Sequence, residues 1–212
     1  MAGSPRTMRY LIYSDLYRYY GRASLLLLMR SIFFGEAGIK FTFWLRVCSC
    51  LRGKSVFWFP LYLFSRLQYR RIGIKYGIDI SDRTPIGPGF YIGHTGCIVV
   101  NPAASIGANC NIHNEVTLGI KNRGRYKGTP TIGDNVYIAP GARIIGNIRV
   151  GNGCAIGANA VVTKDLPDNS VAVGVPAKVI SSEGSVGYVN RTDYDLILGA
   201  RINGDTAGQK SL

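Results

Sequence analysis

The sequence has 212 residues and a formal net charge of +13, with 47% apolar and 17% charged residues. This composition excludes an intrinsically disordered chain and suits one substantial domain, with or without a small appendage. No apolar run approaches the roughly 18 residues of a membrane-spanning helix, since the longest, 56–64, is interrupted by Pro60. Residues 1–7 lack the apolar stretch of a secretory signal, so we expect none there.

The first 77 residues are basic and aromatic. They carry 13 Lys and Arg against Asp15 and Glu36, and they hold 17 of the 23 aromatic residues. Helical spacing of apolar residues predicts helices over 10–20, 24–34, 39–51 and 56–72. We therefore expect an α-helical N-terminal region over 1–77.

One aromatic cluster in this region, residues 57–64, is flanked by cations. The cations are Arg52, Lys54, Arg66, Arg70, Arg71 and Lys75. Such a segment can contact an anionic membrane surface, with the aromatics in the headgroup boundary. Aromatic stripes at helical spacing more often pack in a core or a subunit interface, so both interpretations stay open. No recognition motif accompanies the charge, so we expect no nucleic-acid partner.

A six-residue period begins after residue 77. Its aliphatic positions are Ile80, Ile86, Ile92 and Ile98; then, after a two-residue slip, Val100, Ile106, Ile112 and Leu118; then, after a gap, Ile132, Ile138, Ile144, Val150, Ile156 and Val162. This period fits neither a helix nor a half-buried sheet. It predicts short strands separated by turns, three to a triangular coil, stacked into a solenoid. The gap over 119–131 predicts a loop that leaves the solenoid.

The five cysteines are an odd number and form no CxxC pair. A disulfide framework and a cysteine-rich zinc site are therefore not expected. A reduced, cytoplasmic location fits best, and peripheral contact of the basic segment with the inner face of a membrane stays open.

The repeats over about 75–181, together with the closing segment 156–162 and Val173-Gly-Val-Pro-Ala-Lys178, resemble the hexapeptide-repeat acyltransferase family. The resemblance implies a left-handed parallel β-helix over 78–181, acetyl-CoA as co-substrate, and a homotrimer with active sites between subunits. Within the family, the chain is most similar to the serine acetyltransferase-like branch, which includes polysaccharide O-acetyltransferases.

The sequence contains two histidines, His94 and His113, which fall on neighbouring coils of the predicted solenoid. The motif around His94 matches the family motif in which histidine is the general base that deprotonates the acceptor hydroxyl. A neutral imidazole suits that task because its ordinary pKa of about 6.5 lies near working pH. Asp79 matches the aspartate that supports this histidine in the family. It lies 15 residues earlier, a little under one coil.

The acceptor and the cofactor are assigned to further residues through the same resemblance. We expect acceptor binding by His113, Asn114, Glu115, Arg123 and Tyr126, although His113 may equally well only pack. Arg123 and Tyr126 belong to the basic loop, which closes over the active site in the family. We expect coenzyme A contacts from Ala139, Ala158, Thr163, Lys164, Val175, Pro176 and Lys178. No metal site is expected.

Several positions depart from serine acetyltransferases. Gly93 stands where those enzymes have an aspartate, Pro102 where they have a glutamate, and Gly128-Thr129 where they have an Arg-His pair. These departures led to a predicted sugar hydroxyl acceptor, on a bacterial capsule, O-antigen or exopolysaccharide glycan or a lipid-linked precursor. The alternatives are serine O-acetyltransferase and a non-catalytic, membrane-docking solenoid. A zinc hydratase on this fold would need a third histidine.

The last segment, 182–212, has no repeat and is rich in small polar residues. We expect it to be a loosely ordered tail.

Overall fold

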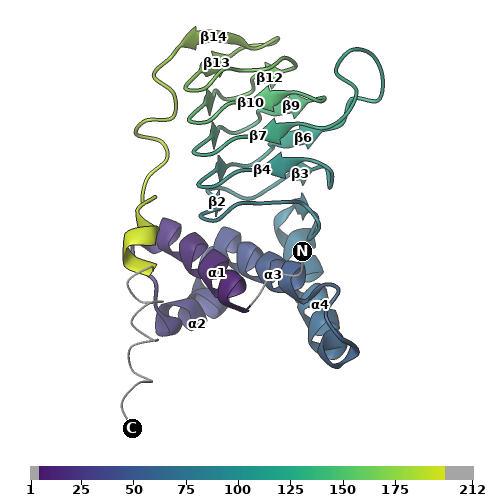
Figure 1. Cartoon of the computed structure of the whole chain (residues 1–212), viewed down its shortest axis with the longest axis vertical. Coiled ribbons are helices and arrows are strands. Elements are labelled where there is room, and N and C mark those ends of the chain that lie inside the picture. Colours follow the sequence, from purple (N-terminus) through teal and green to yellow (C-terminus); the bar gives the residue numbers. More distant parts are fainter. Residues whose placement is uncertain (1–4, 199–212) are drawn as a thin grey trace.

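The computed structural model describes residues 5–198, and it has two parts: a group of helices and a tall stack of strands above them (Figure 1). The four α-helices are α1 (Pro5–Tyr20), α2 (Leu25–Phe34), α3 (Ala37–Leu51) and α4 (Phe59–Tyr76), with a short 3-10 turn at Val56–Trp58. All four predicted helices are therefore present. No helix among the described residues is long and apolar enough to span a membrane.

The helices begin and end at residues that favour helix termini. Ser24 caps α2 by accepting a hydrogen bond from the Leu27 amide. Pro60 stands in the first turn of α4, where no amide donor is needed. Gly77 ends α4 with φ of 63°, a left-handed conformation that favours glycine. The first strand begins at the next residue.

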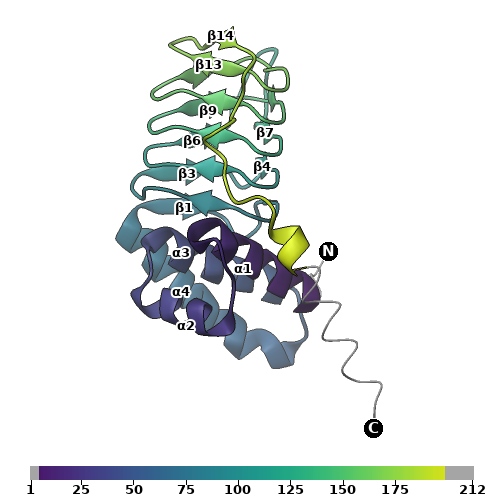
Figure 2. The same ribbon diagram turned by 90° about the vertical axis from the view of Figure 1, so that its left-hand side faces the viewer.

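The strands form three sheets, one for each side of a triangular solenoid (Figures 1 and 2). The first sheet contains β1 (Ile78–Ile80), β3 (Ile98–Val100), β6 (Thr117–Gly119), β9 (Arg143–Ile145) and β12 (Val161–Val162). The second contains β4 (Ser105–Ile106), β7 (Thr131–Ile132) and β10 (Arg149–Val150). The third contains β2 (Tyr91–Ile92), β5 (Asn111–Ile112), β8 (Tyr137–Ile138), β11 (Ala155–Ile156), β13 (Val171–Val173) and β14 (Lys178–Ser181).

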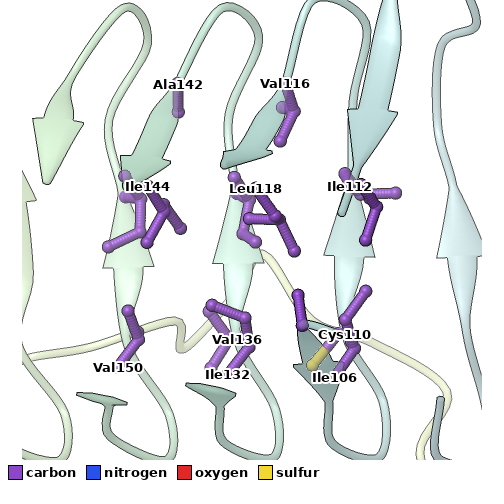
Figure 3. Close-up of a cluster of buried hydrophobic side chains, with 14 of the residues drawn as sticks. Ile106, Cys110, Ile112, Val116, Leu118, Ile132, Val136, Ala142, Ile144 and Val150 are labelled. Atoms are coloured by element: carbon purple, nitrogen blue, oxygen red, sulfur yellow. The ribbon is translucent and has the colours of Figure 1, made fainter. Parts of the chain in front are cut away.

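All strand pairs are parallel except β13 with β14, which are antiparallel. The registers align the aliphatic positions of successive coils, as in Ile92 with Ile112 and Ile112 with Ile138. These side chains fill the interior of the solenoid (Figure 3), and every aliphatic position of the period is buried except Ile86, which is partly buried. The predicted parallel β-helix after a helical region is confirmed.

The helical region closes the first coil of the β-helix. Phe41 and Leu45 of α3 belong to the same buried cluster as the solenoid core. Asp15 and Arg46 form a buried ion pair at 2.9 Å, and Arg46 also donates to the carbonyls of Ile86 and Gly87 at 2.7 and 2.6 Å. This pair therefore fixes two helices to the loop that precedes β2.

The segment 182–198 differs from the predicted loose tail. It runs from β14 back along the third sheet to the helices (Figures 1 and 2), and we call it the C-terminal strap. Ser185 donates to the Asn135 carbonyl at 2.6 Å, and Tyr194 is 2% exposed and packs among tyrosines of α1. Composition could not reveal this path because it depends on contacts with residues 50 or more positions away. Residues 199–212 lie outside the described part.

Candidate active site

The two histidines lie on neighbouring coils, each just after a strand of the third sheet. His94 follows β2 and is exposed, whereas His113 follows β5 and is half-buried. Because β2 and β5 pair in register, the corner loops stack and bring the two ring centroids to 5.7 Å. The amide of Glu115 donates to the Gly96 carbonyl at 2.7 Å, which also joins the two loops. The predicted pairing of the histidines on adjacent coils is thus present.

His113 is held mainly by ring contacts. Its ring meets Tyr137 edge-on at 5.2 Å, and Tyr137 stacks on Tyr188 of the strap at 4.6 Å. Both of its ring nitrogens are buried without a hydrogen-bond partner. Burial, with a smaller contribution from His94, lowers the pKa of His113 below its ordinary value. Burial therefore favours the neutral imidazole of His113.

Gly93 is required by this arrangement. A Cβ built on Gly93 would lie 2.5 Å from Nδ1 of His113, closer than real Cβ contacts. Any side chain at this position, an aspartate included, would displace the His113 ring. Sequence analysis noted Gly93 as a departure from serine acetyltransferases but missed that His113 occupies the space.

Asp79 lies at the centre of β1, in the first sheet, and its side chain is exposed. It lines a hollow of about 500 Å³ together with Arg70 and Cys97, and His94 does not line that hollow. Neither a hydrogen bond nor an ion pair joins Asp79 to His94 in the described structure. The Asp79–His94 pair therefore stays a hypothesis.

The predicted acceptor residues fall into two groups. Asn114 and Glu115 follow His113 at the same corner, and Glu115 has the left-handed φ of 60° that this turn needs. Arg123 and Tyr126 lie in the loop between β6 and β7, which projects from the solenoid as predicted (Figure 1). Lys121 and Gly128 pair across the base of this loop, and the Arg125 guanidinium lies 5.5 Å from the Tyr126 ring centre. Among the described residues, no hydrogen bond or ring contact joins this loop to either histidine.

The predicted coenzyme A residues lie on the upper coils. Ala139 follows β8 and is buried, Ala158 follows β11 and is exposed, and Thr163 and Lys164 follow β12. Val175 and Pro176 form the turn before β14, and Lys178 begins β14. Ala139 and Ala158 stand where the chain leaves the third sheet, whereas Lys164 stands where it leaves the first sheet, so the structure does not gather these residues at one corner. Among residues 5–198, no group of three or more His, Cys, Asp or Glu could hold a metal ion.

Tyr137 and Tyr188 were missed by sequence analysis. Tyr137 stands one position before Ile138, as Asn111 stands before Ile112 and Tyr91 before Ile92. This shared place in the repeat was a usable signal, because parallel register stacks such residues on one face. Nothing in the local sequence marked Tyr188.

Comparison with known proteins places this geometry in a class of transferases. Residues 129–164 match the family described as bacterial transferase hexapeptide (six repeats). A serine acetyltransferase of Bacillus pumilus (strain SAFR-032) is 38% identical over 124 residues, which are 58% of this chain and 57% of that protein. A serine acetyltransferase of Staphylococcus aureus (strain Mu50 / ATCC 700699) is 40% identical over 108 residues, 51% of each chain.

Solved structures agree over a larger share of the chain. Soybean serine acetyltransferase complexed with serine has a TM-score of 0.68 at 30% identity, covering 82% of this chain and 70% of that one. Serine acetyltransferase from Brucella abortus strain S19 has a TM-score of 0.67 at 27% identity, covering 85% and 71%. The chain belongs to the hexapeptide-repeat transferase family. It spans a little over half the length of the curated relatives it matches.

The comparisons correct the predicted acceptor. The relatives and the solved structures are named serine acetyltransferases, which contradicts the prediction of a polysaccharide O-acetyltransferase and supports its stated alternative. The prediction relied on side chains missing at Gly93, Pro102 and the Gly128-Thr129 pair. A missing side chain shows only which contact is absent, and it does not identify another acceptor.

Proposed function

We propose that the chain is a serine O-acetyltransferase that uses acetyl-CoA. The observation that carries the proposal is the exposed His94 imidazole, which lies beside His113 on the adjacent coil. A left-handed winding of the coils and a trimeric assembly, as the family resemblance implies, are part of the same proposal.

The reaction needs one base and one activated acyl group. His94 takes the proton from the serine hydroxyl while that oxygen attacks the thioester carbonyl. The tetrahedral intermediate then expels the coenzyme A thiolate, which receives the proton from the His94 imidazolium. The products are O-acetylserine and coenzyme A. His113 stays neutral and adds no positive charge against that imidazolium, because burial disfavours its protonation.

The remaining predicted residues hold the two substrates. Asp79 would stabilise the His94 imidazolium if the loop of residues 93–97 adjusts on binding. Asn114 and Glu115 border the histidines and offer polar contacts to the amino acid. Arg123 and Tyr126 lie on the loop that projects from the solenoid, so in a trimer they would serve a neighbouring subunit. Lys164 and Lys178 would meet the phosphates of coenzyme A.

The test is release of free thiol from acetyl-CoA with and without L-serine. We expect serine-dependent release that falls by about 10²–10⁴-fold in His94→Ala, the usual contribution of a general base. Arg149→Gln is the matched control, since Arg149 is exposed on the second sheet, which carries no site residue. Unchanged release in His94→Ala would refute the catalytic role. Coenzyme A binding without serine-dependent release would refute the acceptor.

We also propose that the helical region contacts an anionic membrane surface. The helices α2 and α4 lie at the end of the molecule opposite β14 (Figures 1 and 2). They and the preceding turn expose large apolar side chains, with Phe57 at 89% and Phe34 at 85%. We call this the outer helical surface; it comprises Leu25, Leu26, Met29, Phe33, Phe34, Val56, Phe57, Phe59, Phe64, Leu67 and Ile74.

Charge distinguishes a lipid partner from a second copy of the chain. The cations Arg66, Arg70, Arg71 and Lys75 are exposed on α4, and the half-buried Lys54 lies just before the 3-10 turn. Of the acidic residues in this region, Asp15 is buried against Arg46, which leaves Glu36 exposed. Two such surfaces face to face would bring like charges together, whereas anionic headgroups would neutralise them.

Flotation with vesicles tests this surface. We expect the protein to float with phosphatidylglycerol vesicles, but not with phosphatidylcholine vesicles, and to lose binding in Phe57→Ser/Phe59→Ser. Val186→Ser is the matched control, since Val186 is 86% exposed on the strap. Failure to float, together with a dimer that Phe57→Ser/Phe59→Ser dissociates, would assign the surface to a second copy.

A further inference from the structure

A polar hollow lies at the junction of the helical region, the β-helix and the C-terminal strap. Its volume is about 290 Å³, and all of its lining residues have polar side chains: Arg18, Tyr91, Asn111, Tyr188, Asn190 and Arg191. Two of the six are arginines and none is acidic. Three segments of the chain that are far apart in sequence therefore converge on one basic hollow.

Arg18 is the most informative of these residues. It is 5% exposed; its Nε donates to the Gly89 carbonyl at 3.2 Å, and its Nη2 donates to Oδ1 of Asn111. Its Nη1 is buried and has no hydrogen-bond partner. An unsatisfied guanidinium donor in the interior carries a desolvation cost that a bound acceptor would remove.

Among residues 5–198, no carboxylate supplies that acceptor. The Asp15 carboxylate interacts electrostatically with Arg18, but its oxygens already accept hydrogen bonds from Arg46 and from the Phe90 amide. Glu36 raises the pKa of Tyr91 electrostatically, after the larger effect of burial, but it does not line the hollow. Burial lowers the pKa of Arg18, as expected for a buried cation without a counter-charge of its own.

The other residues add donors around the same space. The second guanidinium, that of Arg191, is anchored by donating to the backbone carbonyls of Tyr19 and Arg18. Asn111 bridges the two sides, since its Nδ2 donates to the Tyr188 carbonyl at 3.0 Å. Arginine forks surrounded by hydroxyl and amide groups are the ordinary setting for a carboxylate or a phosphate.

We propose that this hollow binds a small oxyanion, a carboxylate or a phosphate, between Arg18 and Arg191. The bound anion joins the strap to α1 and β5. One lining residue, Asn111, stands two positions before His113 in the chain. Another, Tyr188, stacks on Tyr137, which contacts the His113 ring. Occupancy therefore stabilises the strap and the aromatic contact behind the candidate active site. The proposal does not depend on serine as acceptor.

Binding is measured without acetyl-CoA, by thermal unfolding and calorimetry. Inorganic phosphate and succinate are titrated separately against sodium chloride at equal ionic strength, which separates the two anion classes from general salt effects on a chain of charge +13. We expect at least one of them to raise the unfolding temperature in a saturable way. We also expect slower amide exchange over residues 185–198. No stabilisation by either anion beyond the chloride control would overturn the proposal.

Two variants place the binding in this hollow. Arg191→Gln removes an exposed cation, and Asn111→Asp introduces a carboxylate beside Arg18 with little change in size. Each should weaken the anion affinity at least tenfold while circular dichroism shows a folded protein. Arg83→Gln, at an exposed arginine outside the hollow, is the control and should bind as the native protein does. Equal affinity in all variants would assign the anion to another place, such as the coenzyme A phosphate site.

Discussion

The β-helix buries its aliphatic repeat residues, whereas the helical region exposes many of its large apolar side chains. In the β-helix, the aliphatic residues of the six-residue period point inward, and the strands inside each sheet pair with the coils on both sides. In the helical region, α3 and part of α1 pack inward, while much of α2 and α4 faces outward. The β-helix therefore buries its own aliphatic positions, with Phe41 and Leu45 of α3 closing its first coil, whereas the helical region leaves one apolar face exposed.

The difference shows why one kind of pattern is easier to interpret than the other. A solenoid position repeats in the same environment on every coil, so an aliphatic residue there is buried on each turn. An aromatic stripe on a helix can face the core, a partner or a membrane, and its spacing is the same in each case. The exposed fraction of each aromatic side chain in the folded protein is needed to tell whether it packs in the core.

The largest expected effect is at the joint between the two regions. Arg46→Met should lower the free energy of unfolding by about 3–5 kcal/mol, because it leaves the Asp15 carboxylate buried without its cation. Arg52→Met is the control, since Arg52 is only partly buried and contacts one carbonyl, that of Asp82. Denaturant unfolding measures both. A loss below about 1 kcal/mol in Arg46→Met would show that the Asp15–Arg46 pair does not hold the cap on the β-helix.

The second prediction compares the two apolar surfaces directly. Ile144→Ala, in the solenoid core, should cost about 2–5 kcal/mol because the rigid stack cannot close the cavity. Phe57→Ser, on the outer helical surface, should change stability by no more than about 0.5 kcal/mol. Equal costs would contradict the distinction between an inward and an outward face.

A smaller effect is expected at the histidine corner. Gly93→Ala should cost about 1–3 kcal/mol, because its Cβ would overlap the His113 ring. Adding His113→Ala should recover much of that loss in a double-mutant cycle. Gly119→Ala is the matched control, since its Cβ would meet Ile145 at an ordinary 3.5 Å. Additive losses would show that Gly93 and His113 do not compete for space.

The smallest effect is a pH dependence from His113. Its pKa is lowered in the folded chain by burial and by His94, so the unfolded chain binds the proton more readily. Stability should be constant above the ordinary histidine pKa of about 6.5, and it should fall as the pH drops below that value towards the folded-state pKa. Urea unfolding of native protein and His113→Phe measures the difference. The variant should show a weaker fall, and an identical fall would assign the dependence to other groups.

Much of the fold could be predicted from the sequence. The period located the strands, their interior residues and the loop over 119–131, because each coil repeats the same local geometry. The two histidines on adjacent coils followed from the same register. The prediction of a glycan acceptor was wrong, because it was inferred from absent side chains rather than from groups that are present.

The sequence by itself therefore determined the strands of the β-helix, the four helices before it and the placement of His94 and His113 on neighbouring coils, since these depend on spacing within short stretches of chain. The tertiary structure showed that the helices cap the first coil and that the two histidine rings lie together. Only the tertiary structure decided which face of the cap is exposed, why Gly93 must be glycine, and that the strap returns to α1. It also brought Arg18, Asn111 and Arg191 around one hollow. These features depend on contacts between segments far apart in the chain, and local periodicity carries no information about such contacts.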